Sequence, residues 1–599
     1  MGNTNGPQML YHPTAGVVMD IESANLKSAQ INTKRKSERS VSPLPTHKSI
    51  QIDDSSKKPS NDKTNEKISE NYALLLENLS KAKDFYIDVE FPAESRNISS
   101  NLLQFLPSLQ VNQIVWARPS EIFLNTNVQL FKDDIIPNDI QQGLLGDCYF
   151  LSALAALAER PSFVSRLFES KETNEVGCYS LWLCIDGEWQ NVIIDDFFPV
   201  KKTEQNPTVY LIFSRSNGPE LWVLLLEKAY AKINGGYQNI EAGLCEEALR
   251  DLTGAPTQTL TDFTEKEAWE FLKGGVENNF LIVVSSHFEK KEGKTGGLIS
   301  GHCYSILDIK EVTLNDITTE NLIQLRNPWG HKEWTGDWSD DSNKWTEELR
   351  KELKWEKKDD GIFWMSCKDF CAYYTEISVC RIHQSYNYSS VKIKLEETSY
   401  KFFTFQINQN LDNLSYFTIS QIDKRKLDKN QGLSYVRILL CRYENNEIFL
   451  VDENTGKTRD LCINIENLPA GVYAIFCEIE NNNQKNENTS KNNLVLSAYS
   501  KLSIGFQEIK VDKTQFLNNL FLNFVKSHPK IHQKTMQKYE ESNKIQRVTS
   551  RIADYFCICY FNETEFYSLK EDVEFLENTN FLTSDNNPIE KKQAIKIDS

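Results

Sequence analysis

Three short segments of the chain each carry a side chain that could take part in acyl transfer. Cys148 follows Gln-Gly-Leu-Leu-Gly-Asp, His302 follows a glycine, and Asn327 opens Asn-Pro-Trp-Gly. A thiol nucleophile, an imidazole base and an amide that orients the base together support peptide-bond cleavage. Their order in the chain predicts Cys148 as the nucleophile, His302 as the base and Asn327 as the orienting residue.

The neighbours of Cys148 favour reactivity. A cysteine in an apolar helix is usually a small core residue. Cys148, however, opens an Ala- and Leu-rich run that stops before Pro161, so it is predicted in the first turn of a helix. The helix dipole lowers the pKa of a thiol there. Gly143 and Gly146 allow close approach of the backbone, and Gln142 offers an amide donor for an oxyanion.

The other two segments also have ordinary explanations. A single histidine on a strand is more often a hydrogen-bonded core residue, and Asn-Pro-Trp-Gly is a good turn. His302 precedes a β-like run that would mount it rigidly, and Trp329 could shield a His302–Asn327 hydrogen bond from water. The chemical interpretation depends on all three segments occurring together.

Composition narrows the class of protein. The chain has 599 residues and a formal net charge of -17, which argues against a general affinity for nucleic acid. No cationic and apolar leader opens it, and the apolar runs, such as 280–284, are too short to span a bilayer. Thirteen irregularly spaced cysteines indicate reduced thiols. We expect a cytoplasmic protein with no transmembrane segment.

Four regions follow from the changes in composition. Residues 1–80 are polar and predict a disordered arm. Residues 85–383 mix apolar helix and short strands, whereas 384–510 alternate like the strands of a β-sandwich. Residues 511–599 form an extension of unknown fold that looks helical at first. The expected class is α+β, and the Asn-rich stretch 481–493 is expected to be a loop.

Taken together, the segments resemble the calpain family, papain-like cysteine proteases that calcium usually regulates. The resemblance runs from residue 85 to 383 and implies a two-lobed papain-like core. It also implies that Cys148, His302 and Asn327 form a triad with Gln142 as oxyanion donor. Residues 468–473 are similar to a strand entry in the family's β-sandwich domain. The segments that carry the resemblance of the core are 114–122, 142–149, 221–232, 301–302, 326–330 and 334–336.

Further positions follow from the same resemblance. Trp329, Gly243 and Gly301 match residues that bind substrate in the family. Tyr149 stands where the family commonly has Trp, a change expected to affect packing more than chemistry. No EF-hand loop follows residue 511, so the chain resembles an atypical member, and no small regulatory subunit is expected.

The resemblance implies two calcium sites in the core. Asp139 and Glu220 match the first site, with the carbonyls of Lys132 and Asp134 as further ligands. The second site is matched by Glu333, Asp340 and Asp360, but Ile362 stands where the family has a carboxylate.

The linkage between the calcium sites is also expected to be lost. Pro137 replaces an Arg that joins the two sites in calcium-regulated members. We therefore expect calcium at the first site alone, bound without cooperativity.

The expected activity is limited cleavage of protein substrates by a calcium-modulated endopeptidase, with peripheral membrane contact left open. A second hypothesis is a catalytically weak, calcium-responsive scaffold or interaction protein that keeps the fold. A third is another acyl transfer, as in transglutaminases, whose third residue is Asp; Asn327 argues against it.

Overall fold

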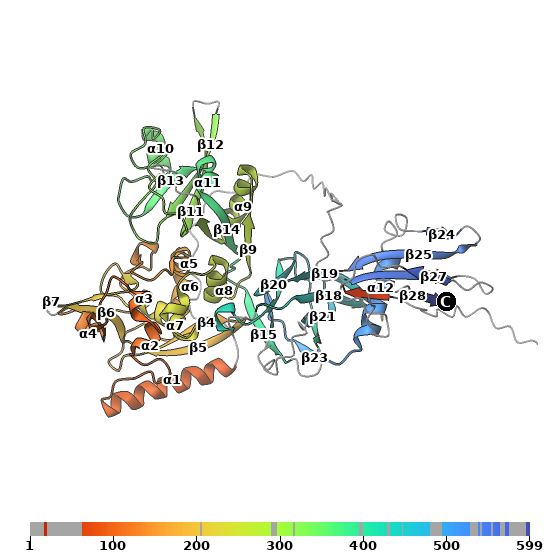
Figure 1. The fold of residues 1–599 in the computed structure, drawn as a ribbon, viewed down its shortest axis with the longest axis horizontal. Helices are drawn as coiled ribbons and strands as arrows, with labels where there is room; N and C mark the ends of the chain where they lie inside the picture. Colours follow the sequence, from red (N-terminus) through yellow and green to blue (C-terminus); the bar gives the residue numbers. More distant parts are fainter. Residues whose placement is uncertain are drawn as a thin grey trace, which may run out of the picture.

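The structure is a computed structural model, and it describes most of the chain between residues 63 and 527. The predicted loop 481–493 and most of the predicted arm 1–80 lie outside the described residues. The described ranges are 17–20, 63–203, 206–288, 296–314, 318–394, 399–427, 432–445, 447–479, 494–527 and five strands beyond residue 536. Helix and strand are mixed up to residue 380, and strands predominate beyond it (Figure 1).

A helical lobe, residues 86–254, surrounds one apolar helix, α5 (Cys148–Ala158). Every residue of α5 after Cys148 is buried, because the run from Tyr149 to Ala158 contains no charged side chain. The neighbours of α5 include α7 (Trp222–Ile233), α8 (Cys245–Thr253) and the strand pair β4 (Cys178–Ile185) and β5 (Glu188–Asp195). The other elements are α2 (Ser95–Ile98), α3 (Leu102–Phe105), β2 (Ile114–Ala117), α4 (Pro119–Ile122), β3 (Ile140–Gln141), α6 (Pro161–Ser165), β6 (Phe198–Thr203), β7 (Asn206–Leu211) and β8 (Arg215–Ser216).

A sheet lobe, residues 257–380, has its own core. Its six antiparallel strands lie in the order β13-β12-β11-β10-β14-β9, and side chains such as Val284, Leu325 and Phe363 are fully buried between the sheet and its helices. The elements are β9 (Thr257–Thr261), α9 (Glu265–Glu277), β10 (Leu281–Ser286), β11 (His302–Leu314), β12 (Thr318–Arg326), α10 (Glu347–Glu352), β13 (Ile362–Ser366), α11 (Cys367–Tyr373) and β14 (Tyr374–Cys380).

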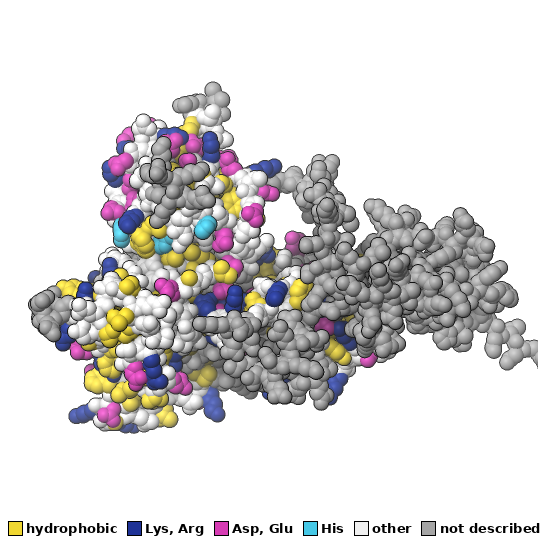
Figure 2. All heavy atoms as spheres, in the orientation of Figure 1, with side chains coloured by type: hydrophobic (Ala, Val, Ile, Leu, Met, Phe, Trp, Pro, Cys, Tyr) yellow, Lys and Arg dark blue, Asp and Glu magenta, His cyan; other side chains and the backbone are white. Residues whose placement is uncertain are grey.

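The two lobes meet where α5 packs against β10 and β11. The Ser152 hydroxyl of α5 donates a hydrogen bond of 2.9 Å to the backbone carbonyl of Cys303 on β11. Leu281, Val283 and Cys303 join the core of the helical lobe although they belong to the sheet lobe. The start of α5 is therefore held opposite the start of β11. In Figure 2, histidine side chains on the visible face lie on the sheet lobe near this border.

Beyond residue 386, two antiparallel sheets form a two-sheet unit, residues 387–527. Their strand orders are β15-β22-β17-β20 and β19-β18-β21-β16-β23, and they share one apolar core. Successive side chains of β16 point to opposite faces of the sheet, so Phe403 and Phe405 face the shared core while Phe402 faces the other side. The strands are β15 (Asn387–Ile393), β16 (Tyr400–Ile407), β17 (Ser415–Ser420), β18 (Val436–Glu444), β19 (Glu447–Gly456), β20 (Asp460–Ile465), β21 (Gly471–Ile479), β22 (Leu494–Ser500) and β23 (Gln507–Ile509).

Helix α12 (Lys513–Ser527) covers the outer face of the five-stranded sheet (Figure 1). Phe516 and Leu520 are buried there, and the rings of Phe516 and Phe402 are 4.7 Å apart. The helical start predicted for the extension is thus part of the two-sheet unit. The remaining strands are β24 (Gln537–Tyr539), β25 (Ser542–Ile552), β26 (Tyr555–Asn562), β27 (Lys570–Val573) and β28 (Ile595–Asp598).

The prediction that residues 1–80 form a disordered arm is wrong for two segments. Helix α1 (Lys63–Ala82) docks on the helical lobe, where Tyr72 is buried and its hydroxyl donates a 2.8 Å hydrogen bond to the Cys178 carbonyl. Apolar residues at helical spacing, Tyr72, Leu75, Leu76 and Leu79, outweigh the polar composition of the region. In addition, β1 (Val17–Asp20) pairs with β26. In the part of the chain that the structure describes, no helix is both long and apolar enough to cross a membrane.

Candidate active site

Cys148 is the first residue of α5, and it is the one residue of that helix that is partly exposed. Behind it lie two buried carboxyl groups, Asp147 and Glu227. Burial raises the pKa of both, to about 7 for Glu227 and well above its ordinary value for Asp147. After burial, the charge of Glu227 is the largest cause that raises the pKa of Asp147.

His302 is the first residue of β11, at the edge of the sheet lobe that faces the start of α5. Gly301 precedes it with a φ of +71°, a left-handed conformation that glycine adopts without strain. The Ser286 hydroxyl donates to the His302 carbonyl at 2.8 Å, and the two residues face each other across β10 and β11. These contacts fix the backbone of His302, whose side chain is almost fully buried.

The ring of His302 is oriented by Asn327, which directly follows β12. His302 Nε2 lies 2.9 Å from Asn327 Oδ1. The Asn327 amide nitrogen donates to the carbonyls of His331 and Lys332 at 2.9 and 3.0 Å, so its oxygen must face the ring. Because an amide oxygen only accepts, Nε2 carries the proton and Nδ1 of the neutral ring is free to accept one.

Trp329 covers this pair and also holds Gln142. Its ring centroid lies 4.9 Å from that of His302. The indole N–H donates a 2.6 Å hydrogen bond to Gln142 Oε1. The Gln142 amide nitrogen is thereby turned the other way, toward the Leu145 carbonyl at 2.7 Å. The Trp329 backbone N–H donates to Asn327 Oδ1 at 3.0 Å, so four residues from three predicted segments are joined in one network of hydrogen bonds.

The predicted lowering of the Cys148 pKa is wrong for this arrangement. A hydrogen bond with the Cys303 thiol and burial raise the pKa of Cys148 above its ordinary value, while a hydrogen bond with His302 lowers it. The raised pKa therefore favours the protonated thiol in the free site. A thiolate must form by transfer of its proton to His302.

The glycines predicted near the substrate have different roles. A Cβ on Gly143 would lie 2.1 Å from the Phe213 carbonyl oxygen, so only glycine fits there. A Cβ on Gly243 would lie 2.5 Å from the Tyr149 ring, so Gly243 makes room for that ring. Gly301 has open space around it.

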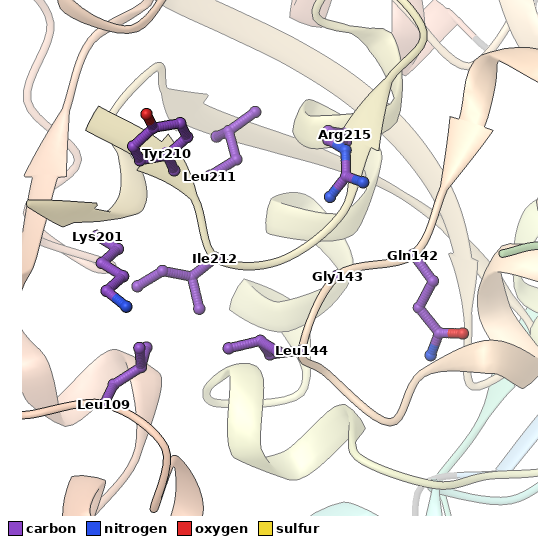
Figure 3. Close-up of a pocket in the computed structure, with 9 residues that line it drawn as sticks. All are labelled: Leu109, Gln142, Gly143, Leu144, Lys201, Tyr210, Leu211, Ile212 and Arg215. Atoms are coloured by element: carbon purple, nitrogen blue, oxygen red, sulfur yellow. The ribbon is translucent and has the colours of Figure 1, made fainter. Parts of the chain in front are cut away.

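A pocket of about 270 Å³ lies beside the Gln142 segment (Figure 3). Leucine and isoleucine side chains supply apolar walls, and Lys201 and Arg215 supply positive charge. Such a pocket can receive an apolar or acidic group next to Gln142. Its lining residues are Leu109, Gln142, Gly143, Leu144, Lys201, Tyr210, Leu211, Ile212 and Arg215.

The two carboxylates of the first predicted calcium site are neighbours. Burial is the main cause that raises the pKa of Glu220 to about 7, and the charge of Asp139 raises it further. Backbone N–H groups of Ile136 and Lys132 donate to Asp139 Oδ2 and Glu220 Oε2 at 2.9 and 3.1 Å. A bound cation would relieve the repulsion between these two groups.

The second predicted set is also grouped. Burial, followed by the charges of Asp340 and Asp360, raises the pKa of Glu333 to about 7. Glu333 Oε1 accepts hydrogen bonds from the backbone of Asp360 and Gly361. Nevertheless, nowhere in the described ranges are three or more His, Cys, Asp or Glu residues arranged to hold a metal ion.

Arg326 lies between the two acidic sets, which the sequence analysis did not anticipate. Burial lowers the pKa of its guanidinium to about 10, while the charges of both Asp360 and Asp139 raise it. It donates to Asn138 Oδ1 and to the Ile140 carbonyl at 2.9 and 3.2 Å. The buried Arg326 cation therefore lies within electrostatic reach of both sets, although Pro137 stands where the linking Arg was expected.

Sequence reasoning missed several residues at this site. Cys245 and Cys303 contact each other beside Cys148, and Arg425 of the two-sheet unit reaches Tyr149. Cys303 directly follows His302, so its place in the site could have been predicted from the sequence. Cys245 and Arg425 are distant in sequence and could only be found from the tertiary structure.

Comparisons with known proteins agree with this geometry. The model of the calpain family cysteine protease matches residues 86–381. Calpain-type cysteine protease ADL1 of Oryza sativa subsp. japonica is 35% identical over 321 residues, which cover 51% of this chain and 14% of that protein. Human Calpain-14 is 38% identical over 304 residues, covering 49% and 42%. Calpain-5 of Caenorhabditis elegans is 32% identical over 355 residues, covering 52% and 53%. The chain thus spans about half or less of the length of these relatives.

Proposed function

Because residues 86–381 form a calpain family cysteine protease domain, we propose that the chain is an endopeptidase that makes limited cleavages in proteins through Cys148, His302 and Asn327. The observation that carries the proposal is the 2.9 Å contact between His302 Nε2 and Asn327 Oδ1, with the ring also in hydrogen-bonding contact with the Cys148 thiol.

The first chemical step is proton transfer from Cys148 Sγ to the free Nδ1 of His302. The thiolate attacks the substrate carbonyl carbon, and the amide N–H of Gln142 stabilises the oxyanion that develops. The C–N bond then breaks, the imidazolium protonates the leaving amine, and a thioester to Cys148 remains. Water, activated by the neutral imidazole, hydrolyses this thioester and restores the thiol.

The raised pKa of Cys148 has a consequence for catalysis. Since a raised pKa favours the protonated thiol, the Cys148 proton must move to His302 before the sulfur can attack. Asn327 supports this step because its oxygen faces the N–H of the imidazolium. Trp329 excludes water from that hydrogen bond.

A set of substitutions tests the proposal on an unstructured substrate such as casein. Cys148→Ser and His302→Ala should remove activity, and Asn327→Ala should reduce it less. Cys371→Ser is the matched control, since Cys371 is equally half-buried but lies on α11. Full activity in Cys148→Ser would refute the nucleophile, and no activity in the unmodified chain would favour a scaffold.

We propose that the two-sheet unit is the β-sandwich domain of the family. Its shared core between two antiparallel sheets supports this. We also propose that the protein is cytoplasmic, because the eleven cysteines whose side chains the structure describes are all free thiols.

We propose calcium as a ligand of Asp139 and Glu220, completed by backbone carbonyls and water, since calcium takes about 6–8 oxygen ligands. The mutual repulsion of the two carboxylates supports the proposal. Calorimetry of the full chain should show calcium binding that is lost in Asp139→Asn and kept in the exposed control Asp412→Asn. Equal binding in both variants would exclude this site.

A further inference from the structure

Two cysteines with no part in the proposed catalysis adjoin the nucleophile. The Sγ atoms of Cys245 and Cys303 are 3.0 Å apart. The thiol of Cys303 is in turn in hydrogen-bonding contact with that of Cys148. The Ser285 hydroxyl lies 3.7 Å from Cys245 Sγ and 3.6 Å from Cys303 Sγ. Cys303 is thus the middle member of a row of three thiols.

The three thiols come from three different elements and differ in exposure. Cys148 begins α5, Cys245 begins α8, and Cys303 is the second residue of β11. Cys245 and Cys303 are 2% and 7% exposed, whereas Cys148 is partly open to solvent. A small oxidant therefore reaches Cys148 first.

We propose that Cys303 and Cys245 form a thiol relay that rescues Cys148 after oxidation by a peroxide and stores the oxidising equivalents as a Cys245–Cys303 disulfide. The inference rests on the proposed function in one respect: Cys148 must be the reactive thiol.

The relay consists of one oxidation and two exchanges. After the Cys148 proton has moved to His302, the thiolate attacks a peroxide, which gives the sulfenic acid Cys148–SOH and releases hydroxide or an alkoxide. The Cys303 thiol then displaces water to form a Cys148–Cys303 disulfide. Finally, the Cys245 thiol attacks the Cys303 sulfur, the first disulfide breaks, and Cys148 leaves as a thiol. One peroxide is reduced and two thiols are oxidised in total.

The order of these steps follows from the geometry. A disulfide bond is about 2.05 Å long, so the Cys245 and Cys303 sulfurs need to approach by only about 1 Å. Cys303 contacts both other thiols, so it first forms a disulfide with Cys148 and then exchanges it for a disulfide with Cys245. The benefit is chemical, because a sulfenic acid that is not resolved proceeds to an irreversible sulfinic acid.

The test treats the full chain with one equivalent of hydrogen peroxide, then measures intact mass, mapped disulfides and casein cleavage. The unmodified chain should lose two hydrogens, show a Cys245–Cys303 link and keep its activity. Cys245→Ser should stop at an inactive Cys148–Cys303 link that dithiothreitol reverses. Cys303→Ser should gain one oxygen on Cys148 as a sulfenic acid that dithiothreitol still reduces. A second equivalent of peroxide should convert it to a sulfinic acid, with roughly tenfold less activity that dithiothreitol does not restore.

Controls separate the relay from folding and from the proposed function. Cys371→Ser should behave as the unmodified chain, and melting temperatures show whether each variant is folded. Cys148→Ser should form no Cys245–Cys303 link at this dose. Because the mapped disulfides do not depend on proteolysis, they report on the relay even if the chain cleaves nothing. Absence of a Cys245–Cys303 link in the oxidised chain, or equal recovery in Cys303→Ser after the second equivalent, would overturn the proposal.

Discussion

Arg425 connects the two-sheet unit to the residue that follows the nucleophile. Its guanidinium donates to the Tyr149 hydroxyl at 2.7 Å, to the Tyr230 hydroxyl at 3.2 Å and to Glu247 Oε2 at 2.7 Å. It also bonds Asp423 of its own unit at 3.0 Å. Tyr149 is almost fully buried, so its hydroxyl has little access to water. We predict that Tyr149→Phe and Arg425→Met are energetically coupled.

The expected loss of unfolding free energy follows from the groups that each substitution leaves without a hydrogen-bond partner. Arg425→Met leaves Glu247 without this partner in a largely buried place, which should cost about 3 kcal/mol of unfolding free energy. Tyr149→Phe keeps the ring against Gly243 and removes one hydrogen bond to a charged group, which should cost about 1.5 kcal/mol. Since the hydrogen bond is already absent in Arg425→Met, the coupling energy should be about 1–1.5 kcal/mol.

Denaturant unfolding of the two single variants and the double variant measures this coupling. The matched control replaces Arg442, a partly buried arginine of the same unit that donates to the Ala470 carbonyl. Arg442→Met should show no coupling to Tyr149→Phe. Additive losses for Tyr149→Phe and Arg425→Met, within about 0.3 kcal/mol, would refute the direct contact as the link between the units.

Three further predictions concern single side chains. Cys303→Ala removes the first cause that raises the pKa of Cys148, so alkylation of Cys148 by iodoacetamide should move to lower pH; an unchanged pH profile would contradict this. Burial, aided by Arg381, lowers the pKa of His383 to about 4, below its ordinary value near 6.5. Because the unfolded chain already binds a proton on this histidine near pH 6.5, the free energy of unfolding should be highest above pH 6.5. It should fall by about 1–2 kcal/mol between pH 6.5 and 4, a figure that allows for solvent screening of this partly exposed ring. His383→Gln should flatten that slope in melts recorded across the range, whereas an equal slope would exclude His383 as its source. Trp329→Phe removes the N–H that orients Gln142, so kcat should fall about tenfold or more with the fold intact; an unaltered kcat would mean that Gln142 is oriented without it.

The local pattern of the sequence was sufficient for the elements that carry the chemistry. The uncharged run after Cys148 predicts a buried helix, which is α5, and the β-like run predicted to start at His302 is β11. The alternating apolar residues of 384–510 predict strands, which the structure has there. These features depend on neighbours a few residues apart, which is the information a sequence pattern contains.

The same reasoning failed where composition was averaged over long segments. The polar arm contains one helix with an apolar stripe, so its average hid a docked element, α1. Likewise, the helix dipole is a local reason to expect a low pKa for the Cys148 thiol. Contact with Cys303 and burial, which depend on the tertiary structure, raise this pKa instead.

The sequence by itself therefore determined which residue types are available for catalysis and which elements hold them, because periodicity and motif spacing are local. Only the tertiary structure decided what surrounds them: Cys245 next to Cys303, Arg326 between two acidic sets, and Arg425 on Tyr149. The physical reason is that hydrogen bonds and charge interactions depend on distance in space, and these partners are up to 276 residues apart in the chain.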